Sequence, residues 1–128
     1  MCTILTPITQ QSFNRQVARC EHGTLHLSWH AVTWSLSRRD FERLHAFVQD
    51  APQSGQARFE APPFVYGRGP SIDEWGGNVT LWFGPAGLAF TPDDFEAFRS
   101  LLQDARDRLS HLPGPIRHAW HTRPGDLN

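Results

Sequence analysis

The strongest constraint on the fold is an internal duplication. Residues 23–51 align without a gap on residues 77–105, at a constant offset of 54 positions. Eight aligned positions are identical, including the runs at 40–42 and 49–51. Aromatic and aliphatic side chains replace one another at many of the others. A chain that repeats its apolar pattern in this way is expected to build its core from two copies of one structural unit.

Each copy begins with a pattern typical of a β-hairpin. Residues 24–29 alternate between polar and apolar side chains, which places Leu25, Leu27 and Trp29 on one face of a strand. A short turn and a second strand, Val32–Leu36, follow. The second copy repeats this alternation at the same offset, so the sequence predicts one hairpin in each copy.

Both copies then change to a helical pattern. Ser37 and Thr91 stand where a hydroxyl caps the N-terminus of a helix, and Pro92 suits the first helical position. The first helix is expected to end near Ala51 and the second before Pro113. Each copy is therefore predicted to be a ββα unit.

These units predict an α+β protein. We expect a two-layer sandwich in which the duplicated ββα units share one antiparallel sheet of four or more strands, with both helices on one face. Gln16–Cys20 is expected to add a strand ahead of the first copy. The connector, residues 52–76, is expected to hold one irregular strand within Arg58–Tyr66, and the tail, residues 113–128, to be irregular. Residues 1–128 are interpreted as a single domain.

Composition argues against several classes of function. The net charge is −1, so the chain has no overall field to attract nucleic acid or an anionic membrane. No stretch approaches the roughly 20 apolar residues of a membrane-spanning helix. Two cysteines and an N-terminus without an export signal favour a cytoplasmic protein with reduced thiols.

The duplication also separates positions needed for folding from candidates for function, because side chains shared by both copies are explained by the fold. Possible metal ligands differ most between the copies. The first copy and the residues just before it carry cysteine and histidine where the corresponding positions of the second copy carry neither. These residues are Cys20, His22, His26, His30 and His45.

Cys20 and His22 are the candidate metal ligands. Alternate residues of a strand lie roughly 7 Å apart, close enough to reach one ion, whereas residues four apart lie roughly 13 Å apart and need a bend in the chain. Further ligands would have to come from Cys2, or from His118 and His121 in the tail. The alternative is that these polar side chains occupy a solvated strand face and a turn.

Three tryptophans are candidates for partner binding. Trp82 is expected on the sheet face away from the helices, Trp75 lies in the connector, and Trp120 lies in the tail. An exposed tryptophan on a sheet is typical of a protein interface and can also stack on a nucleobase. The arginines of the first part of the chain form only a small basic patch, which disfavours nucleic acid as the partner.

The sequence lacks the motifs of common catalytic sites. It contains no Gly-x-Ser-x-Gly, no phosphate-binding glycine loop and no His-Glu-x-x-His. Asp93 and Asp94 belong to a helix start, and the acidic pair Asp73-Glu74 in the connector has no convergent partners in the sequence. We therefore expect a non-enzymatic protein without a cofactor.

Residues 18–48 carry a resemblance to known sequences. The run Cys20–Leu27, followed by the hairpin and the run Asp40–Leu44, resembles an uncharacterised family of small bacterial proteins. Members of that family have a cysteine and a glycine at the start of a hairpin, and then a capped helix. The second copy departs from this pattern, with Glu74 in place of the cysteine. The resemblance implies the ββα architecture and no activity.

Together these features favour a non-enzymatic binding or scaffold protein that engages a protein partner or a second copy of itself as a homodimer. The first alternative is a protein that binds a transition metal or haem through Cys20 and His22. The second alternative is a binder of single-stranded nucleic acid that uses Trp82 and the arginines.

Overall fold

The structure, a computed structural model, describes residues 2–69 and 78–112. Within these residues the chain forms two compact units. The first unit contains the residues up to Glu42 and those from Leu101 onward, and the second contains the residues between them. No helix in the described ranges is long and apolar enough to cross a membrane.

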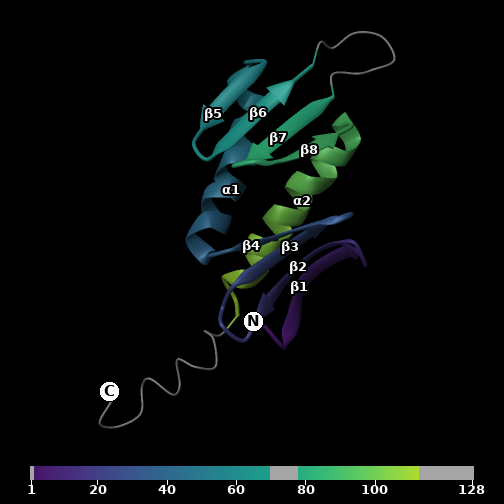
Figure 1. The fold of residues 1–128 in the computed structure, drawn as a ribbon, viewed down its shortest axis with the longest axis vertical. Coiled ribbons are helices and arrows are strands. Elements are labelled where there is room, and N and C mark those ends of the chain that lie inside the picture. The colour runs from purple at the N-terminus through teal and green to yellow at the C-terminus, as the bar shows by residue number, and fades with distance from the viewer. Residues whose placement is uncertain (1, 70–77, 113–128) are drawn as a thin grey trace, which may run out of the picture. The chain divides into compact units, whose positions relative to one another are not determined.

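The first unit holds a four-stranded antiparallel sheet whose strands follow one another in chain order (Figure 1). Its strands are β1 (Leu5–Ser12), β2 (Arg15–Cys20), β3 (Leu25–Trp29) and β4 (Val32–Leu36). The hairpin predicted for the first copy is β3–β4, and the additional strand predicted over Gln16–Cys20 is β2. β1 was not predicted.

The second unit repeats this arrangement with a second four-stranded antiparallel sheet. Its strands are β5 (Arg58–Ala61), β6 (Phe64–Arg68), β7 (Val79–Phe83) and β8 (Ala86–Phe90). A short 3₁₀ helix, η1 (Pro52–Ser54), precedes β5. The connector therefore contains two paired strands, where the sequence predicted one irregular strand.

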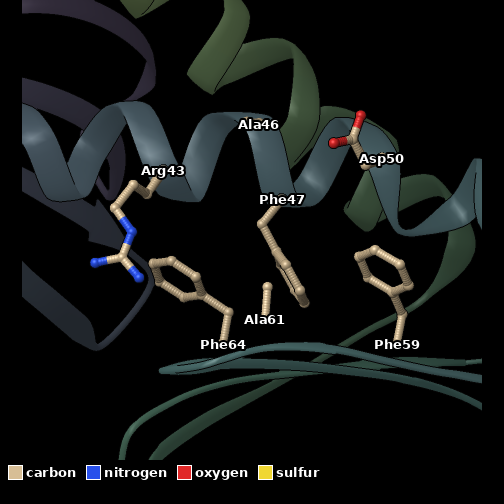
Figure 2. Close-up of a pocket in the computed structure, with 7 residues that line it drawn as sticks. All are labelled: Arg43, Ala46, Phe47, Asp50, Phe59, Ala61 and Phe64. Atoms are coloured by element: carbon tan, nitrogen blue, oxygen red, sulfur yellow. The ribbon is translucent and has the colours of Figure 1, made fainter.

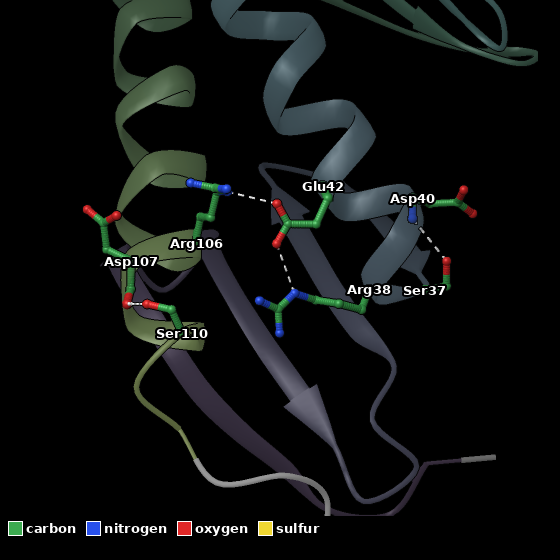
Figure 3. Close-up of polar contacts among 7 residues, drawn as sticks. All are labelled: Ser37, Arg38, Asp40, Glu42, Arg106, Asp107 and Ser110. Carbon is green, nitrogen blue, oxygen red and sulfur yellow. Dashed lines mark hydrogen bonds and ion pairs between the residues drawn. The ribbon is translucent and has the colours of Figure 1, made fainter.

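Each sheet is followed by a helix, and these are α1 (Arg38–Asp50) and α2 (Pro92–Leu109). Both helices begin at the predicted caps. The Ser37 hydroxyl accepts a hydrogen bond from the Asp40 N–H at 3.0 Å, which Figure 3 shows. The Thr91 hydroxyl accepts the equivalent bond from the Asp94 N–H at 3.1 Å. Two of the otherwise unpaired N–H groups of the helix starts are thereby satisfied.

The boundary between the units falls within both helices, so each unit contains a part of α1 and a part of α2. Buried side chains of the first unit are mainly aliphatic, with Val17 and Leu27 on the sheet and Leu102 on α2. Aromatic rings dominate the second unit, where the ring centroids of Phe90 and Phe98 are 5.0 Å apart. The predicted α+β class and the duplicated unit are confirmed.

Glu42 links the two helices within the first unit (Figure 3). Its carboxylate accepts hydrogen bonds from Arg106 at 2.8 Å and from Arg38 at 3.0 Å. Burial raises the pKa of Glu42, but the bonds from Arg106 and Arg38 outweigh burial, and its pKa falls below the ordinary value.

The prediction that the two copies share one sheet is wrong, because each copy belongs to its own sheet. The reason is the additional hairpin that precedes each copy. β2 pairs with β3, and β6 pairs with β7. These pairings give each copy a four-stranded sheet of its own.

The structural repeat is longer than the sequence repeat. Leu27 pairs with Val17 on β2, and the corresponding Leu81 pairs with Tyr66 on β6. Leu27 and Leu81 are 54 positions apart, whereas Val17 and Tyr66 are 49 apart. The connection between β6 and β7 is therefore five residues longer than the connection between β2 and β3. Because of this difference, an ungapped alignment of the sequence does not detect that the first hairpin of one unit corresponds to the first hairpin of the other.

The turn between the last two strands of each unit, β3–β4 and β7–β8, has the same backbone conformation in both units. His30 and Gly84 have φ angles of 57° and 60°. The His30 N–H donates to the Asn14 carbonyl at 2.6 Å, and the Gly84 N–H donates to the Pro63 carbonyl at 3.1 Å. One backbone conformation thus occurs in both units, although glycine adopts it without strain and histidine does not.

Candidate metal centre

A tight turn between β2 and β3 brings the candidate ligands of the first unit together. Gly23 adopts a φ of 85°, and its N–H donates to the Cys20 carbonyl at 3.0 Å. The Cys20 N–H in turn donates to the Thr24 carbonyl at 3.0 Å. Since Ala18 pairs with His26, the side chains of Cys20 and His26 lie on the same face of the hairpin.

Glu21, in the same turn, holds the N-terminal segment beside the hairpin. Its carboxylate accepts hydrogen bonds from the Thr3 N–H at 3.0 Å and the Thr3 hydroxyl at 2.8 Å. It also accepts one from the Ile4 N–H at 3.2 Å. These bonds place Cys2, the preceding residue, next to the turn.

Four possible ligand atoms converge at this point. Atoms of Cys2, Cys20, Glu21 and His22 all lie within 4.8 Å of one another. The Nδ1 atom of His22 lies 3.7 Å from the Cys2 sulfur and 3.8 Å from the Cys20 sulfur. His26 adds a further nitrogen, with its Nε2 atom 3.4 Å from the Cys2 sulfur.

These distances match the dimensions of a tetrahedral metal site. Zinc binds cysteine sulfur at about 2.3 Å and histidine nitrogen at about 2.0 Å, and a tetrahedral angle then separates sulfur from nitrogen by about 3.5 Å. The three sulfur–nitrogen separations are 3.4, 3.7 and 3.8 Å. These three separations are therefore compatible with ligands that share one ion.

A hydrogen bond orients the ring of His26. Ser35 lies opposite His26 on β4, and its hydroxyl oxygen is 3.4 Å from the Nδ1 atom of His26. If Nδ1 carries the proton and donates it to Ser35, Nε2 presents its lone pair toward Cys2. Metal-binding histidines are commonly held by a partner of this kind on the second nitrogen.

The two thiols differ in acidity. Burial raises the pKa of Cys20, but hydrogen bonds from Cys2, His26 and His22 outweigh burial and lower this pKa to about 5. The hydrogen bond with Cys20 raises the pKa of Cys2. The pair thus stabilises a thiolate on Cys20, and thiolate is the form of cysteine that binds metals.

Glu21 has a different role from the other members of the cluster. Hydrogen bonds from the backbone and side chain of Thr3 lower the pKa of Glu21 to about 2. Both carboxylate oxygens already accept bonds from the N-terminal segment. We therefore assign Glu21 to positioning Cys2, and not to binding the ion.

The structure brings together the two predicted ligands Cys20 and His22, and Cys2 joins them as one of the expected additional ligands. The other expected ligands, His118 and His121, lie outside the described residues. His30 lies at the opposite end of the hairpin, where Arg15 donates to it at 3.0–3.2 Å.

The predicted partner-binding tryptophans are not part of the metal-ligand cluster. Trp82 is 44% exposed on β7, and its ring covers Gly87, the residue opposite it on β8. A Cβ atom added at Gly87 would come within 2.7 Å of this ring. Trp75 and Trp120 lie outside the described residues, as do Asp73 and Glu74.

The sequence does not predict the contributions of Glu21 and Ser35. It predicts that His26, four residues from His22, reaches the same ion only if the chain bends, and the turn at Gly23 is such a bend. Glu21 gave no sequence signal, because its bonds go to a segment 17 or 18 positions away.

Comparison with known proteins assigns neither a family nor a function to this chain. The chain matches no protein-family model, and neither the curated proteins nor the solved structures contain a significant match. The resemblance to a family of small bacterial proteins therefore stays a prediction.

Proposed function

We propose that this protein binds a transition metal ion of the zinc class through Cys2, Cys20, His22 and His26. The observation that carries the proposal is a set of three sulfur–nitrogen distances, 3.4 Å from Cys2 to His26 and 3.7 and 3.8 Å from His22 to Cys2 and Cys20. Two sulfurs and two imidazole nitrogens are a common ligand set of structural zinc sites.

The ligand set favours a structural role for the ion over a catalytic one. Catalytic zinc usually has three protein ligands and an open position for water or substrate, whereas structural zinc has four protein ligands. Haem is a poorer fit, because its iron takes one or two axial protein ligands and not a cluster of four.

The bound ion would connect the N-terminal segment to the β2–β3 turn. Cys2 comes from the segment before β1, while Cys20 and His22 come from the end of β2 and the turn. A link of this kind stabilises the folded state, because the unfolded chain does not hold these ligands together. The second unit has Thr80 where the first has His26, so one site per chain is expected.

Metal titration tests this proposal. Protein purified without a histidine tag and treated with a chelator should bind one equivalent of Zn²⁺ and unfold at a higher temperature with the ion than without it. Cys20→Ser and His22→Ala should each lower the affinity for Zn²⁺ by at least about tenfold, because each removes a ligand.

His111→Ala is the matched control. His111 is an exposed histidine just after α2 and has no part in the cluster, so its replacement should leave the affinity unchanged. The proposal fails if the protein binds no stoichiometric metal, or if the His22 and His111 variants lose affinity equally.

A further inference from the structure

A second candidate site lies in the other unit, between α1 and β5. It is a pocket of about 250 Å³. Its lining residues are Arg43, Ala46, Phe47, Asp50, Phe59, Ala61 and Phe64 (Figure 2). Figure 2 shows the Phe47 ring pointing from α1 toward the sheet, between Phe59 and Phe64. Its ring centroid is 5.5 Å from that of Phe59 and 5.4 Å from that of Phe64.

In the first unit, hydrogen bonds join the edge strand to the helix at the equivalent position. There, Thr9 of β1 donates to Asp104 of α2 at 3.4 Å, and Arg108 donates to the Ile8 carbonyl at 3.3 Å. Ile8 itself is a bulged residue of β1 and is buried, with 5% of its surface exposed. Side chains and hydrogen bonds therefore join the edge strand to the helix.

The second unit lacks these contacts among its described residues. The residue of β5 that corresponds to Thr9 is Phe59, since both lie opposite the equivalent position of the neighbouring strand. Asp50 corresponds to Asp104, and Phe59 cannot donate a hydrogen bond to it. β5 also runs without a bulge, so that no residue corresponds to Ile8. The contacts between the edge strand and the helix thus differ between the two copies, and the pocket lies where the second unit lacks them.

The size and lining of the pocket indicate its occupant. Sites for small molecules usually have volumes of about 300–1,000 Å³, and this pocket is smaller. Three phenylalanine rings favour an apolar or aromatic group. A single inserted side chain meets both conditions.

The same chain presents such a side chain. Phe13, in the turn between β1 and β2, is 81% exposed, the highest value among the exposed large apolar residues of the described ranges. Turns of this kind usually carry glycine, asparagine or proline, so the turn itself does not explain a phenylalanine. The residues beside it, Ser12 and Asn14, are uncharged and would not repel the charged Arg43 and Asp50 at the pocket.

We infer that Phe13 of one molecule inserts into the Phe47–Phe59–Phe64 pocket of a second copy of this chain. Each molecule carries both surfaces, so the association produces closed reciprocal dimers, larger rings or chains of molecules. One aromatic anchor gives a weak association, with a dissociation constant of about 10 μM to 1 mM.

Two variants test the inference, because each removes one side of the contact. Phe13→Ser removes the inserted ring and keeps the pocket. Ala46→Arg places a long side chain at the pocket and keeps Phe13. Both positions are exposed, so both variants should fold. Light scattering across a concentration series should show association of the unmodified protein and its weakening by about thirtyfold or more in each variant.

Mixing the two variants gives the decisive result. The Ala46→Arg chain supplies Phe13 and the Phe13→Ser chain supplies the pocket, so an equimolar mixture should form dimers and nothing larger. Leu112→Ser, which changes another exposed apolar residue, should associate like the unmodified protein. A chelator should not alter the association, since the contact contains no residue of the metal cluster.

Three results would overturn the inference. They are a monomer at all concentrations, association that survives Phe13→Ser, and a mixture of the variants that stays monomeric. If the protein is a monomer at all concentrations, the pocket would instead have to bind an apolar side chain of a different protein. None of these results bears on metal binding, which is measured separately.

Discussion

The carboxylate of Glu21 accepts hydrogen bonds from both the N–H and the hydroxyl of Thr3, at 3.0 and 2.8 Å. This contact holds the N-terminal segment, and with it Cys2, against the β2–β3 turn. Glu21→Gln should therefore lower the affinity for Zn²⁺ by about tenfold or more, although it removes no ligand. Thr3→Val, which keeps the backbone donor, should have a smaller effect. Equal affinities of the Glu21→Gln variant and the unmodified protein would contradict this role.

The same contact predicts a dependence on pH. The pKa of Glu21 is lowered to about 2, whereas an unfolded glutamate titrates near 4.3. A lowered folded-state pKa means that the contact stabilises the protein above the unfolded value and loses this effect as the pH falls toward 2. NMR titration of the Glu21 carboxyl group in metal-free protein should give a midpoint well below 4. A midpoint near 4.3 would show that the contact is not formed in solution.

The two helix caps are expected to contribute equally, because they are equivalent positions of the repeat. Ser37→Ala and Thr91→Ala should each lower the free energy of unfolding by about 1 kcal/mol, since each leaves an N–H unsatisfied. Ser110→Ala is a suitable control, because its hydroxyl donates to the Asp107 carbonyl and caps no helix start (Figure 3). Urea denaturation measures the free energy of unfolding of all three variants. A Ser37 or Thr91 variant as stable as the Ser110 variant would contradict the role of that hydroxyl as a helix cap.

The contacts of Glu42 with Arg38 and Arg106 should be weak and sensitive to salt. A double-mutant cycle with Glu42→Gln and Arg106→Gln should give a small coupling energy that decreases in 1 M salt, because both side chains are partly exposed. Because the pKa of Glu42 is lowered, its contribution is present above the ordinary carboxyl pKa and is lost as the pH falls. A coupling energy unchanged by high salt would argue against an ionic contact.

The left-handed backbone at His30 provides a test of the structural repeat. His30→Gly should change stability little, because glycine removes the strain at a φ of 57° while the bonds to Arg15 are lost. His30→Val should be about 1–2 kcal/mol less stable than His30→Gly. Gly84→Val, at the equivalent turn with a φ of 60°, should show a similar loss. A valine tolerated at either turn would contradict the assigned backbone conformation.

The local elements were predictable because their signals are local. Alternation identified β3 and β4, and hydroxyl residues identified the starts of α1 and α2. β1 could not be predicted from the repeat, because its pairing with β2 contains two irregularities and its residues have no aligned counterpart. β5 could not be predicted from the repeat either. The longer β6–β7 connection changes the distance between corresponding residues of the two units from 54 to 49 positions.

The candidate site was predictable in part. The difference between the copies pointed to Cys20 and His22, and the need for further ligands pointed to Cys2. His26 required a bend in the chain, which strand spacing alone does not supply and which the turn at Gly23 provides. The pocket beside Phe47 could not be predicted, because it results from the absence of a bulge in β5 and not from a residue pattern.

X-ray absorption spectroscopy of the zinc-loaded protein tests the central proposal most directly. The account predicts two sulfur ligands at about 2.3 Å and two nitrogen ligands at about 2.0 Å from one ion per chain. Cys2→Ser should remove one of the two sulfur ligands from the spectrum. A spectrum with oxygen and nitrogen neighbours alone, or a protein that holds no stoichiometric zinc, would contradict the account.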